Sequence, residues 1–329
     1  MFSRWMKRQR EVERQSQGGV KSSHSPVWMN SLIQFGCKTL DFYIYTERID
    51  MRERRVLKAS EKSGPLVSVI MATFNEEPDM IGKSISSIID QTYENFELLI
   101  FDDSTKQETK DKIDSFTTDP RVKVFRFPSR VGFVKSLNKG LEAAKGKYIA
   151  RMDGDDMSLP IRFEKEVHFL EKHKDIAVVG GQINIMDENN KITSSRSYPL
   201  GGMKLYLFSC ARNPLAHPTI MMHRSLVDKG FRYDETLKMS EDLDFWLRLL
   251  NAGYHIANLP DNVLNYRVQS NFMEKRSSTK QREYMANVRK KNFDSHHLFH
   301  SVLSNAFGWM FTHVPVGAIN NIYRKENNQ

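Results

Sequence analysis

Between residues 66 and 179, short apolar runs alternate with segments whose apolar residues recur at helical spacing. The runs Leu66–Met71 and Phe96–Phe101 are rich in apolar, β-branched and aromatic residues, which is typical of buried strands. Between them, Asp79–Gln91 places its isoleucines mostly three and four residues apart and predicts an amphipathic helix. The same reasoning predicts further strands at Val122–Phe127, Lys147–Met152 and Ile176–Val179, and further helices at Thr109–Phe116, Val131–Ala144 and Ile161–His173. This alternation indicates βαβ units, and therefore an α/β fold with a mostly parallel sheet and flanking helices.

After about residue 185 the alternation becomes irregular. Strands are predicted at Ile192–Tyr198, Thr219–Met222 and Val263–Val268, and helices at Ser240–Asn251 and Ser278–Asn292. We expect an α/β domain over residues 64–275, divided into halves at 64–185 and 186–275. A basic N-terminal arm with a helical extension precedes it over residues 1–63, and an amphipathic helical region follows over 276–329.

Composition excludes several classes of protein. The 329 residues are 40% hydrophobic and 27% charged, which is ordinary for a globular chain and unlike a collagenous or wholly disordered one. Two cysteines cannot build a disulfide scaffold or a cysteine-rich zinc site. No uninterrupted apolar stretch follows the basic N-terminus, so no secretory signal is predicted and a cytoplasmic setting fits best.

The net charge of +9 is concentrated near the N-terminus. Residues 1–62 hold 13 Lys and Arg against 7 Asp and Glu, whereas the other 267 residues hold 36 against 33. A nucleic-acid-binding body would more often show clustered basic residues interleaved with aromatic ones. We therefore expect no nucleic-acid partner, and interpret the basic arm as suited to an anionic membrane surface.

Three polar clusters follow predicted strands, at Thr73–Asn75, Asp102–Ser104 and Asp153–Asp156. Because ligands of open parallel α/β sheets bind beyond the carboxyl ends of the strands, these clusters should face one crevice. Three carboxylates within Asp153–Asp156 repel one another unless a cation neutralises them, and oxygen ligands favour Mg²⁺ or Mn²⁺. An acidic surface turn explains the spacing equally well, although the position after an apolar strand favours a metal. Taken alone, Asp102 and Asp103 are more simply explained as capping or turn residues.

Glycine-rich phosphate loops are missing from the first predicted strand-to-helix connection. That connection has neither Gly-x-Gly-x-x-Gly nor Gly-x-x-x-x-Gly-Lys-Ser/Thr. This disfavours a dinucleotide-dependent dehydrogenase and a P-loop nucleotide hydrolase. A nucleotide would have to be held by side chains and a metal.

Four motifs in order resemble those of a family 2 glycosyltransferase. They are VSVIMATFNEE (67–77), SISSIIDQTYENFELLIFDDS (84–104), RVGFVKSLNKGLEAAKGKYIARMDGDD (130–156) and SEDLDFWLRL (240–249). The resemblance covers roughly residues 66–270 and implies a GT-A fold, a Rossmann-like arrangement. It also implies inverting transfer of a sugar from a nucleotide diphosphate donor, most often a UDP-sugar, with a divalent cation. Residues 64–185 would then be the nucleotide-binding half and residues 186–275 the acceptor half.

The resemblance also implies site residues. Asp103 matches the carboxylate that contacts uracil, and Thr73 lies in the stretch that lines the base pocket. Asp153 and Asp155 match the outer residues of the DxD motif, of which the first meets the ribose and the last the metal, and Asp156 adjoins them. Together with the strand-end clusters, this gives donor-binding candidates Thr73, Asn75, Asp102, Asp103, Lys135, Asp153 and Asp156, a weaker candidate Asn138, and metal ligands Asp155 and Asp153.

The catalytic candidates lie at the start of a predicted helix. Asp242 matches the family's catalytic base, with Glu241 beside it. An inverting transfer needs one base opposite the leaving diphosphate. Stabilisation of the helix N-terminus is the simpler alternative explanation for both acids. His217 and Arg267 are candidates for contacting the acceptor or the diphosphate, although a packed histidine and an ordinary loop explain these two as well.

The tails bear on the acceptor. Leu298–Tyr323 is apolar but interrupted by polar residues, which predicts an interfacial helix or a helix packed on the domain rather than a membrane span. A membrane setting implies a saccharide acceptor linked to a lipid, at the cytoplasmic face of an inner membrane, in capsule, O-antigen or exopolysaccharide assembly. A nucleotidyltransferase and a basic membrane or nucleic-acid adaptor remain alternatives.

Overall fold

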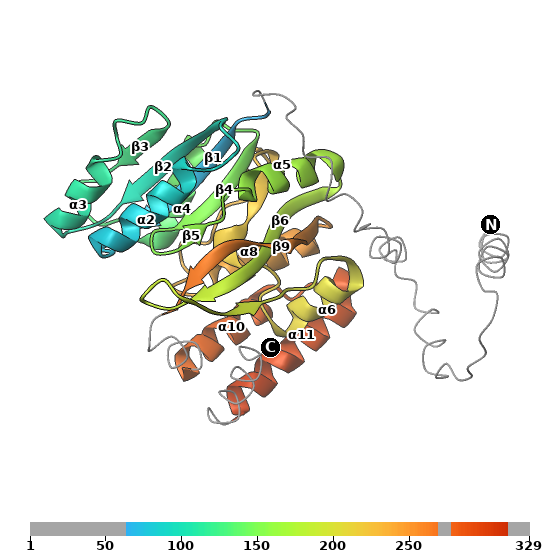
Figure 1. Cartoon of the computed structure of the whole chain (residues 1–329). Helices are drawn as coiled ribbons and strands as arrows, with labels where there is room; N and C mark the ends of the chain where they lie inside the picture. The colour runs from blue at the N-terminus through green and yellow to red at the C-terminus, as the bar shows by residue number, and fades with distance from the viewer. Residues whose placement is uncertain (1–63, 269–277, 315–329) are drawn as a thin grey trace. The chain divides into compact units, whose positions relative to one another are not determined.

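In the computed structural model, residues 64–268 and 278–314 are described, and they form an α/β fold with one mixed sheet (Figure 1). Within these ranges the sheet has nine strands in the order β3-β2-β1-β4-β8-β6-β9-β5, with β7 paired to β6. The predicted arm and helical extension over 1–63 lie outside the described residues, as do 269–277 and 315–329.

The first half of the sheet is parallel. Strands β1 (Val67–Thr73), β2 (Phe96–Asp102), β3 (Val122–Phe125) and β4 (Tyr148–Asp153) pair side by side with β1 between β2 and β4. The register places Thr73 opposite Asp102, and Ala72 opposite Asp153. The prediction that the three polar clusters share one sheet edge is therefore confirmed.

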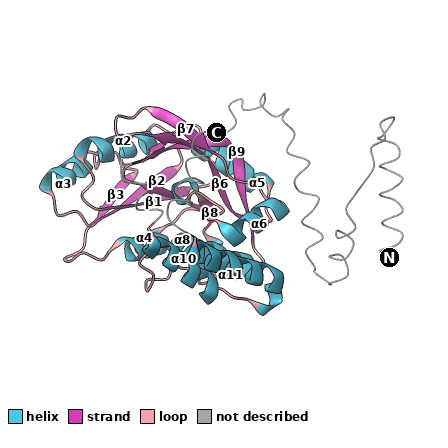
Figure 2. Cartoon of the chain, turned by 90° about the horizontal axis from the view of Figure 1, so that it is seen from below, coloured by secondary structure: helices cyan, strands magenta, loops and turns pink. Residues whose placement is uncertain are grey.

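Helices cover both faces of this parallel part, as Figure 2 shows. On one face, Val67, Val69 and Met71 pack in a core with α2 (Pro78–Ile89), α3 (Gln107–Asp114) and α5 (Arg162–Lys172). On the other face, Ile70 packs in a core with α4 (Phe133–Ala143) and α8 (Glu241–Asn251). The alternation of β1 side chains between two cores explains why the strand reads as a continuous apolar run.

The second half of the sheet is mixed and longer than predicted. Strand β6 runs over Ile176–Met186 and pairs in parallel with β9 (His255–Arg267). Strand β8 (Met221–His223) lies antiparallel to both β4 and β6. Antiparallel pairs also add β5 (Met157–Ser158), on β9, and β7 (Ile192–Arg196), on β6. The predicted strand ends at Val179 and start at Val263 were wrong, because polar and glycine residues continue the pairing.

The connections of this half are helical. A single 3₁₀ turn, His217–Thr219, precedes β8, and a short helix α7 (Ser225–Asp228) follows it. Helix α6 (Gly202–Ala211) had not been predicted. Its apolar residues surround the helix instead of recurring on one side, so its sequence lacks the periodic signal.

Two helices complete the described chain. Helix α10 (Thr279–Lys291) packs on α8 through Val288, which is buried in a small cluster with Leu243 and Leu247. A 3₁₀ turn, Ser295–His297, leads into α11 (Leu298–His313), which lies against α10 and α6. Across residues 64–268 and 278–314, every helix is too short or too polar to traverse a bilayer.

Candidate active site

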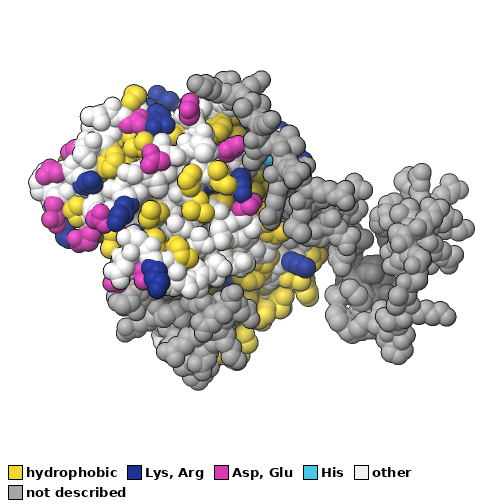
Figure 3. Space-filling view, viewed as in Figure 1, with side chains coloured by type: hydrophobic (Ala, Val, Ile, Leu, Met, Phe, Trp, Pro, Cys, Tyr) yellow, Lys and Arg dark blue, Asp and Glu magenta, His cyan; other side chains and the backbone are white. Residues whose placement is uncertain are grey.

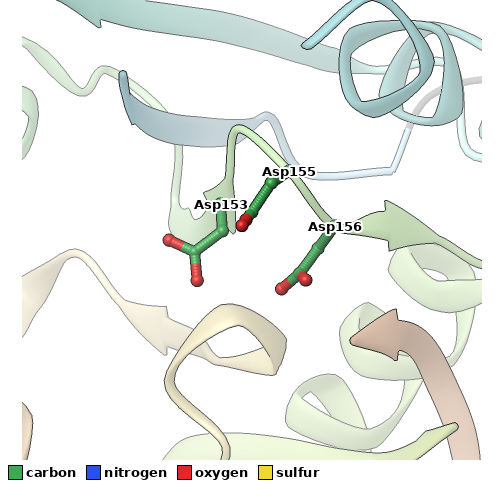
Figure 4. Close-up of side chains that lie close together, drawn as sticks. All are labelled: Asp153, Asp155 and Asp156. Carbon is green, nitrogen blue, oxygen red and sulfur yellow. The ribbon is translucent and has the colours of Figure 1, made fainter. Parts of the chain in front are cut away.

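The side chains of three aspartates lie close together at the end of β4 (Figure 4). Asp153 is the last residue of the strand, and Asp155 and Asp156 follow in the turn before β5. One carboxylate oxygen from each lies within 4.8 Å of the others. The close spacing results from the reversal of the chain after Gly154.

Burial and mutual repulsion make this cluster electrostatically unfavourable without a cation. Burial, followed by the charge of Asp153, raises the pKa of Asp155 to about 6. Burial also raises the pKa of Asp156 well above its usual range, with the charges of Asp155 and Asp153 adding to the effect. The Oδ2 atom of Asp156 is buried without a hydrogen-bond partner in the described structure. A hard divalent cation fits these oxygen donors, since it would neutralise the charge and use that oxygen.

Arg151 was missed by the sequence analysis. It lies two residues before Asp153 on β4, and its Nη1 donates to Asp153 Oδ2 over 2.7 Å. Its side chain is 6% exposed and also lies over the ring of Phe133. Alternation along the strand, which puts residues two apart on one face, was the available signal. A metal ion bound by Asp153 would therefore compete with the Arg151 guanidinium for the Asp153 carboxylate.

Glu76 is a second missed residue. Its carboxylate accepts hydrogen bonds from the Phe74 amide at 2.9 and 3.1 Å. Burial raises the pKa of Glu76 to about 7, and the charges of Asp155 and Asp153 contribute. A β-carbon on Gly154 would lie 3.1 Å from the carboxylate carbon of Glu76, so glycine permits the close approach of the two loops.

Thr73 and Asp102 contact each other at the carboxyl ends of β1 and β2. Thr73 Oγ1 donates to Asp102 Oδ1 over 3.2 Å, and Arg126 Nε donates to Asp102 Oδ2 over 2.7 Å. The Asp102 side chain is fully buried. In this arrangement the carboxylate organises the loop beyond β2, where the Ser104 amide also donates to it.

The next two candidates connect loops. Asn75 has a φ of 60°, in the left-handed region, and its side-chain oxygen accepts hydrogen bonds from the amides of Thr105 and Lys106. Asp103 accepts a 2.7 Å hydrogen bond from the Gly132 amide, at the start of α4. Asp103 is half-buried.

Lys135 and Asn138 both lie on α4 and differ in exposure. Lys135 is exposed. Asn138 is buried, and its side chain exchanges hydrogen bonds of 2.9 Å with the backbone of Tyr233. Asn138 therefore fixes α4 to the segment that precedes α8.

Glu241 and Asp242 begin α8 directly after Ser240, whose φ of 63° turns the chain sharply. Burial, followed by the charge of Asp242, raises the pKa of Glu241 to about 7. The Asn213 side chain donates to Asp242 Oδ2, and the Leu243 amide to Oδ1. These hydrogen bonds hold the Asp242 carboxylate in one orientation.

His217 and Arg267 support the two acidic groups. His217 Nε2 lies 2.8 Å from the Tyr233 hydroxyl, and Nδ1 lies 3.9 Å from Glu241 Oε1. Burial lowers the pKa of His217 well below its usual range, so the ring is neutral at pH 7. The Arg267 backbone amide donates to Asp156 Oδ1, and its Nε donates to the carbonyl of Asp155, each over 2.7 Å.

A cavity of about 630 Å³ joins these groups to the C-terminal helices. Its lining includes Asp153, Glu241 and Asp242, together with Phe311 of α11. Six Lys and Arg side chains also line it, those of Arg151, Arg196, Arg212, Lys238, Arg282 and Arg289. The cavity thus brings the end of β4, at Asp153, and the start of α8 to one space large enough for a small organic ligand.

Comparisons with known proteins identify the class to which this fold and site belong. Residues 68–231 match the family model described as glycosyl transferase family 2. EpsE of Bacillus subtilis, which carries the name of a glycosyltransferase, is 37% identical over 66% of this chain and 78% of that protein. WbnJ of Escherichia coli, an O-antigen biosynthesis glycosyltransferase, is 34% identical over 64% and 82%. AmsE of Erwinia amylovora, an amylovoran biosynthesis glycosyltransferase, is 30% identical over 64% and 79%.

Solved structures show the same fold. S. aureus TarS 1–349 in complex with UDP-GlcNAc superposes with a TM-score of 0.56 at 22% identity, covering 74% of this chain and 72% of that one. Of the longer TarS chain, this chain spans 41%. The chain belongs to glycosyl transferase family 2, with a GT-A-like fold, and is therefore a glycosyltransferase. This finding replaces the nucleotidyltransferase and adaptor alternatives.

Proposed function

We propose that the protein is an inverting glycosyltransferase that moves a hexose or N-acetylhexosamine from a UDP-sugar to a hydroxyl of a saccharide acceptor. The observation that carries this proposal is the cavity itself, because Asp153 and Asp242 line it together from separate elements. A donor anchored at the acidic turn would present its sugar to a base at the start of α8. The named relatives act in surface polysaccharide synthesis, which supports the same pathway class here.

The donor would bind along the carboxyl ends of β1, β2 and β4. Asp103 would accept from the nucleobase beside Thr73, and Asp153 would meet the ribose. Asn75, Asp102, Lys135 and Asn138 would shape or support this pocket.

Mg²⁺ or Mn²⁺ would be held by Asp155 with Asp153, and Asp156 adjoins them. When bound, such an ion stabilises the negative charge on the leaving diphosphate. Arg267 would support this site by donating to the Asp156 carboxylate and to the Asp155 carbonyl, rather than by reaching the substrate.

The chemical step is a single displacement. The acceptor hydroxyl oxygen forms a bond to the anomeric carbon as the bond from that carbon to the diphosphate oxygen breaks. Asp242 takes the hydroxyl proton, and UDP leaves with the electron pair. Asn213 orients the Asp242 carboxylate, and Glu241, whose pKa burial raises to about 7, is partly protonated near that pH and so carries less negative charge beside Asp242.

The acceptor would enter from the side of the C-terminal helices. The six Lys and Arg side chains of the cavity suit an acceptor that carries a phosphate or carboxylate, such as a saccharide linked to a lipid diphosphate. That acceptor class supports a peripheral position at the cytoplasmic face of the inner membrane. We propose the same division of the chain as before: residues 64–185 bind the nucleotide, residues 186–275 bind the acceptor, and residues 276–329 have a separate role.

The test is a donor screen that measures nucleotide release. The protein is incubated with individual UDP-, GDP- and dTDP-sugars, with Mn²⁺ or with EDTA. Release of UDP alone, supported by Mn²⁺ and reduced about 10³-fold or more in Asp242→Asn, is the expected result. Asp228→Asn, at an exposed position on α7, is the matched control and should retain wild-type release. Undiminished release in Asp242→Asn removes the base assignment, and release from another nucleotide class removes the donor assignment.

A further inference from the structure

The C-terminal helix α11 packs its polar side against the protein and exposes its apolar side, the opposite of an ordinary surface helix. The residues it buries against the protein are small or polar, and His300, Ser301 and Ser304 are each 3% exposed. The residues it turns outward are apolar, with Phe299 60% and Trp309 66% exposed. A helix that merely covers a domain would bury its apolar side.

Specific hydrogen bonds hold this reversed orientation. His300 Nε2 lies 2.8 Å from Ser209 Oγ on α6. Arg289 Nη1 of α10 donates to Ser304 Oγ over 2.9 Å. Rotating α11 to bury its apolar side would break both contacts and leave buried polar groups without partners. The outward position of the aromatic side chains is therefore built into the packing of α6, α10 and α11.

The outward side forms a continuous surface. Leu298 and Val302 are 56% and 53% exposed, and Met310 is 40% exposed. These positions, with Phe299 and Trp309, fall on one stripe along the helix. Leu207 of the adjacent α6 is also exposed. Figure 3 shows hydrophobic side chains gathered where Figure 1 places α6 and α11, with a basic side chain among them.

The charges around this stripe match an anionic surface. Residues 295–314 contain no Asp, Glu, Lys or Arg. On the two helices that pack against α11, Lys204 of α6 and Lys280 and Lys290 of α10 are exposed, together with one acidic residue, Glu283. An apolar stripe with aromatic side chains and neighbouring lysines is the composition that binds the interfacial layer of a bilayer.

We propose that the outward stripe of α11 (Leu298, Phe299, Val302, Trp309 and Met310) docks the enzyme on an anionic lipid bilayer. The inference deepens the proposed function, because it rests on the membrane setting inferred there and assigns it to one surface. The same helix lines the cavity through Gly308 and Phe311. Docking on α11 would thus bring the acceptor cavity to the lipid surface.

Vesicle flotation tests this surface with the full-length chain and no donor or acceptor. Wild type is mixed with vesicles of phosphatidylglycerol and phosphatidylcholine in equal parts, and with phosphatidylcholine vesicles alone. We expect binding to the mixed vesicles and weaker binding to the neutral ones. The variant Phe299→Gln/Val302→Gln/Trp309→Gln should partition at least tenfold less onto the mixed vesicles.

The matched control replaces three exposed apolar residues elsewhere, Ile161→Gln/Ile192→Gln/Leu200→Gln, which are 40%, 44% and 37% exposed. It should bind vesicles as wild type does. A second variant, Lys204→Glu/Lys290→Glu, should lose the preference for phosphatidylglycerol while keeping the binding to neutral vesicles. Circular dichroism and thermal unfolding check that each variant is folded.

Three results overturn the proposal. One is wild-type vesicle binding by the α11 variant, which would assign binding to another part of the chain. Another is failure of the wild type to bind either vesicle. The third concerns the oligomeric state, measured by light scattering. If the wild type is a dimer, and the α11 variant is a monomer that still binds vesicles as the wild type does, the stripe is an interface between two copies. Because the vesicle assay measures no sugar transfer, a negative result in it would not change the interpretation of the donor screen.

Discussion

At the scale of single residues, the acidic turn after β4 is costly to ionise. Asp156 is buried and Asp155 half-buried beside Asp153, and loss of hydration together with repulsion raises the pKa values of both carboxyls. A group that is costly to ionise in the empty protein gains most when a cation arrives. Removing one charge should therefore affect stability and metal binding in opposite directions.

Asp155→Asn should raise the melting temperature in EDTA by about 2–4 °C, because a repulsion of roughly 1 kcal/mol is removed. The same variant should lose the melting shift that Mn²⁺ gives the wild type, and its nucleotide release should fall at least about 100-fold. Calorimetry with and without Mn²⁺ checks the first two effects. An equal Mn²⁺ shift in variant and wild type would contradict the assignment of Asp155 as a ligand.

Glu241 predicts a pH dependence of stability. Its pKa is raised to about 7 in the folded chain, so folding favours the protonated form. The stability from this group is complete below its unfolded pKa and is lost as pH rises through about 7. Between pH 5 and pH 8, the free energy of unfolding of wild type should fall by about 1–3 kcal/mol more than that of Glu241→Gln. Denaturant titrations at the two pH values measure this difference, and parallel curves would contradict it.

The sequence identified Asp153, Asp155 and Asp156 as a cluster because they are adjacent in the chain. It did not identify Glu76, although this residue lies within one of the motifs. What distinguishes Glu76 from the neighbouring Glu77 is burial, since Glu77 is exposed and pairs with Lys106. Burial depends on which loops meet in three dimensions, and a single amino-acid sequence does not show which of its loops do so.

At the scale of elements, Asp244 joins α8 to α10. Its side chain is fully buried and lies 2.7 Å from Arg248 Nε and 3.1 Å from Lys291 Nζ. Asn292 donates to it as well. One carboxylate thus anchors the end of α10 to the helix that carries Asp242.

Asp244→Ala should lower the free energy of unfolding by about 2–4 kcal/mol, because buried hydrogen bonds to a charge are lost. Asp228→Ala, which removes an ion pair of the same helical spacing whose side chains are 41% and 52% exposed, should cost less than about 1 kcal/mol. Urea denaturation of the two variants provides the comparison. Equal losses would show that Asp244 does not anchor α10.

Elements were predicted well where periodicity was strong and poorly where it was interrupted. The parallel strands of the first half were located within a few residues. In β6 the prediction stopped before Gly180 and Gly181, which look like a turn in the sequence. In the structure, a β-carbon on Gly181 would lie 2.5 Å from Val263 Cγ2 of β9, so glycine is needed for the two strands to approach. In β9, Pro260 and Asp261 obscured the strand in the same way.

At the scale of the whole molecule, the domain that ends at residue 268 is expected to depend on residues 278–314 for its stability. Ending the chain at residue 268 would expose Leu243 and Leu247, which are 1% and 3% exposed when Val288 covers them. The shortened chain should therefore unfold at a lower temperature and bind a hydrophobic dye before unfolding. Differential scanning fluorimetry checks this. An unchanged melting temperature would instead support the separate C-terminal region expected from the sequence.

Helix α11 lines the cavity through Gly308 and Phe311 on one side and carries the apolar stripe on the other. An α-helix with its side chains is about 10 Å across, so with the stripe on a bilayer the cavity wall would stand about that far from the lipid. The helix would then set the distance between the lipid surface and the cavity. An acceptor hydroxyl would reach Asp242 only after projecting at least one helix diameter beyond the headgroups. Acceptors with a shorter stem should remain unglycosylated, so the thickness of one helix would select the length of the chain that is extended.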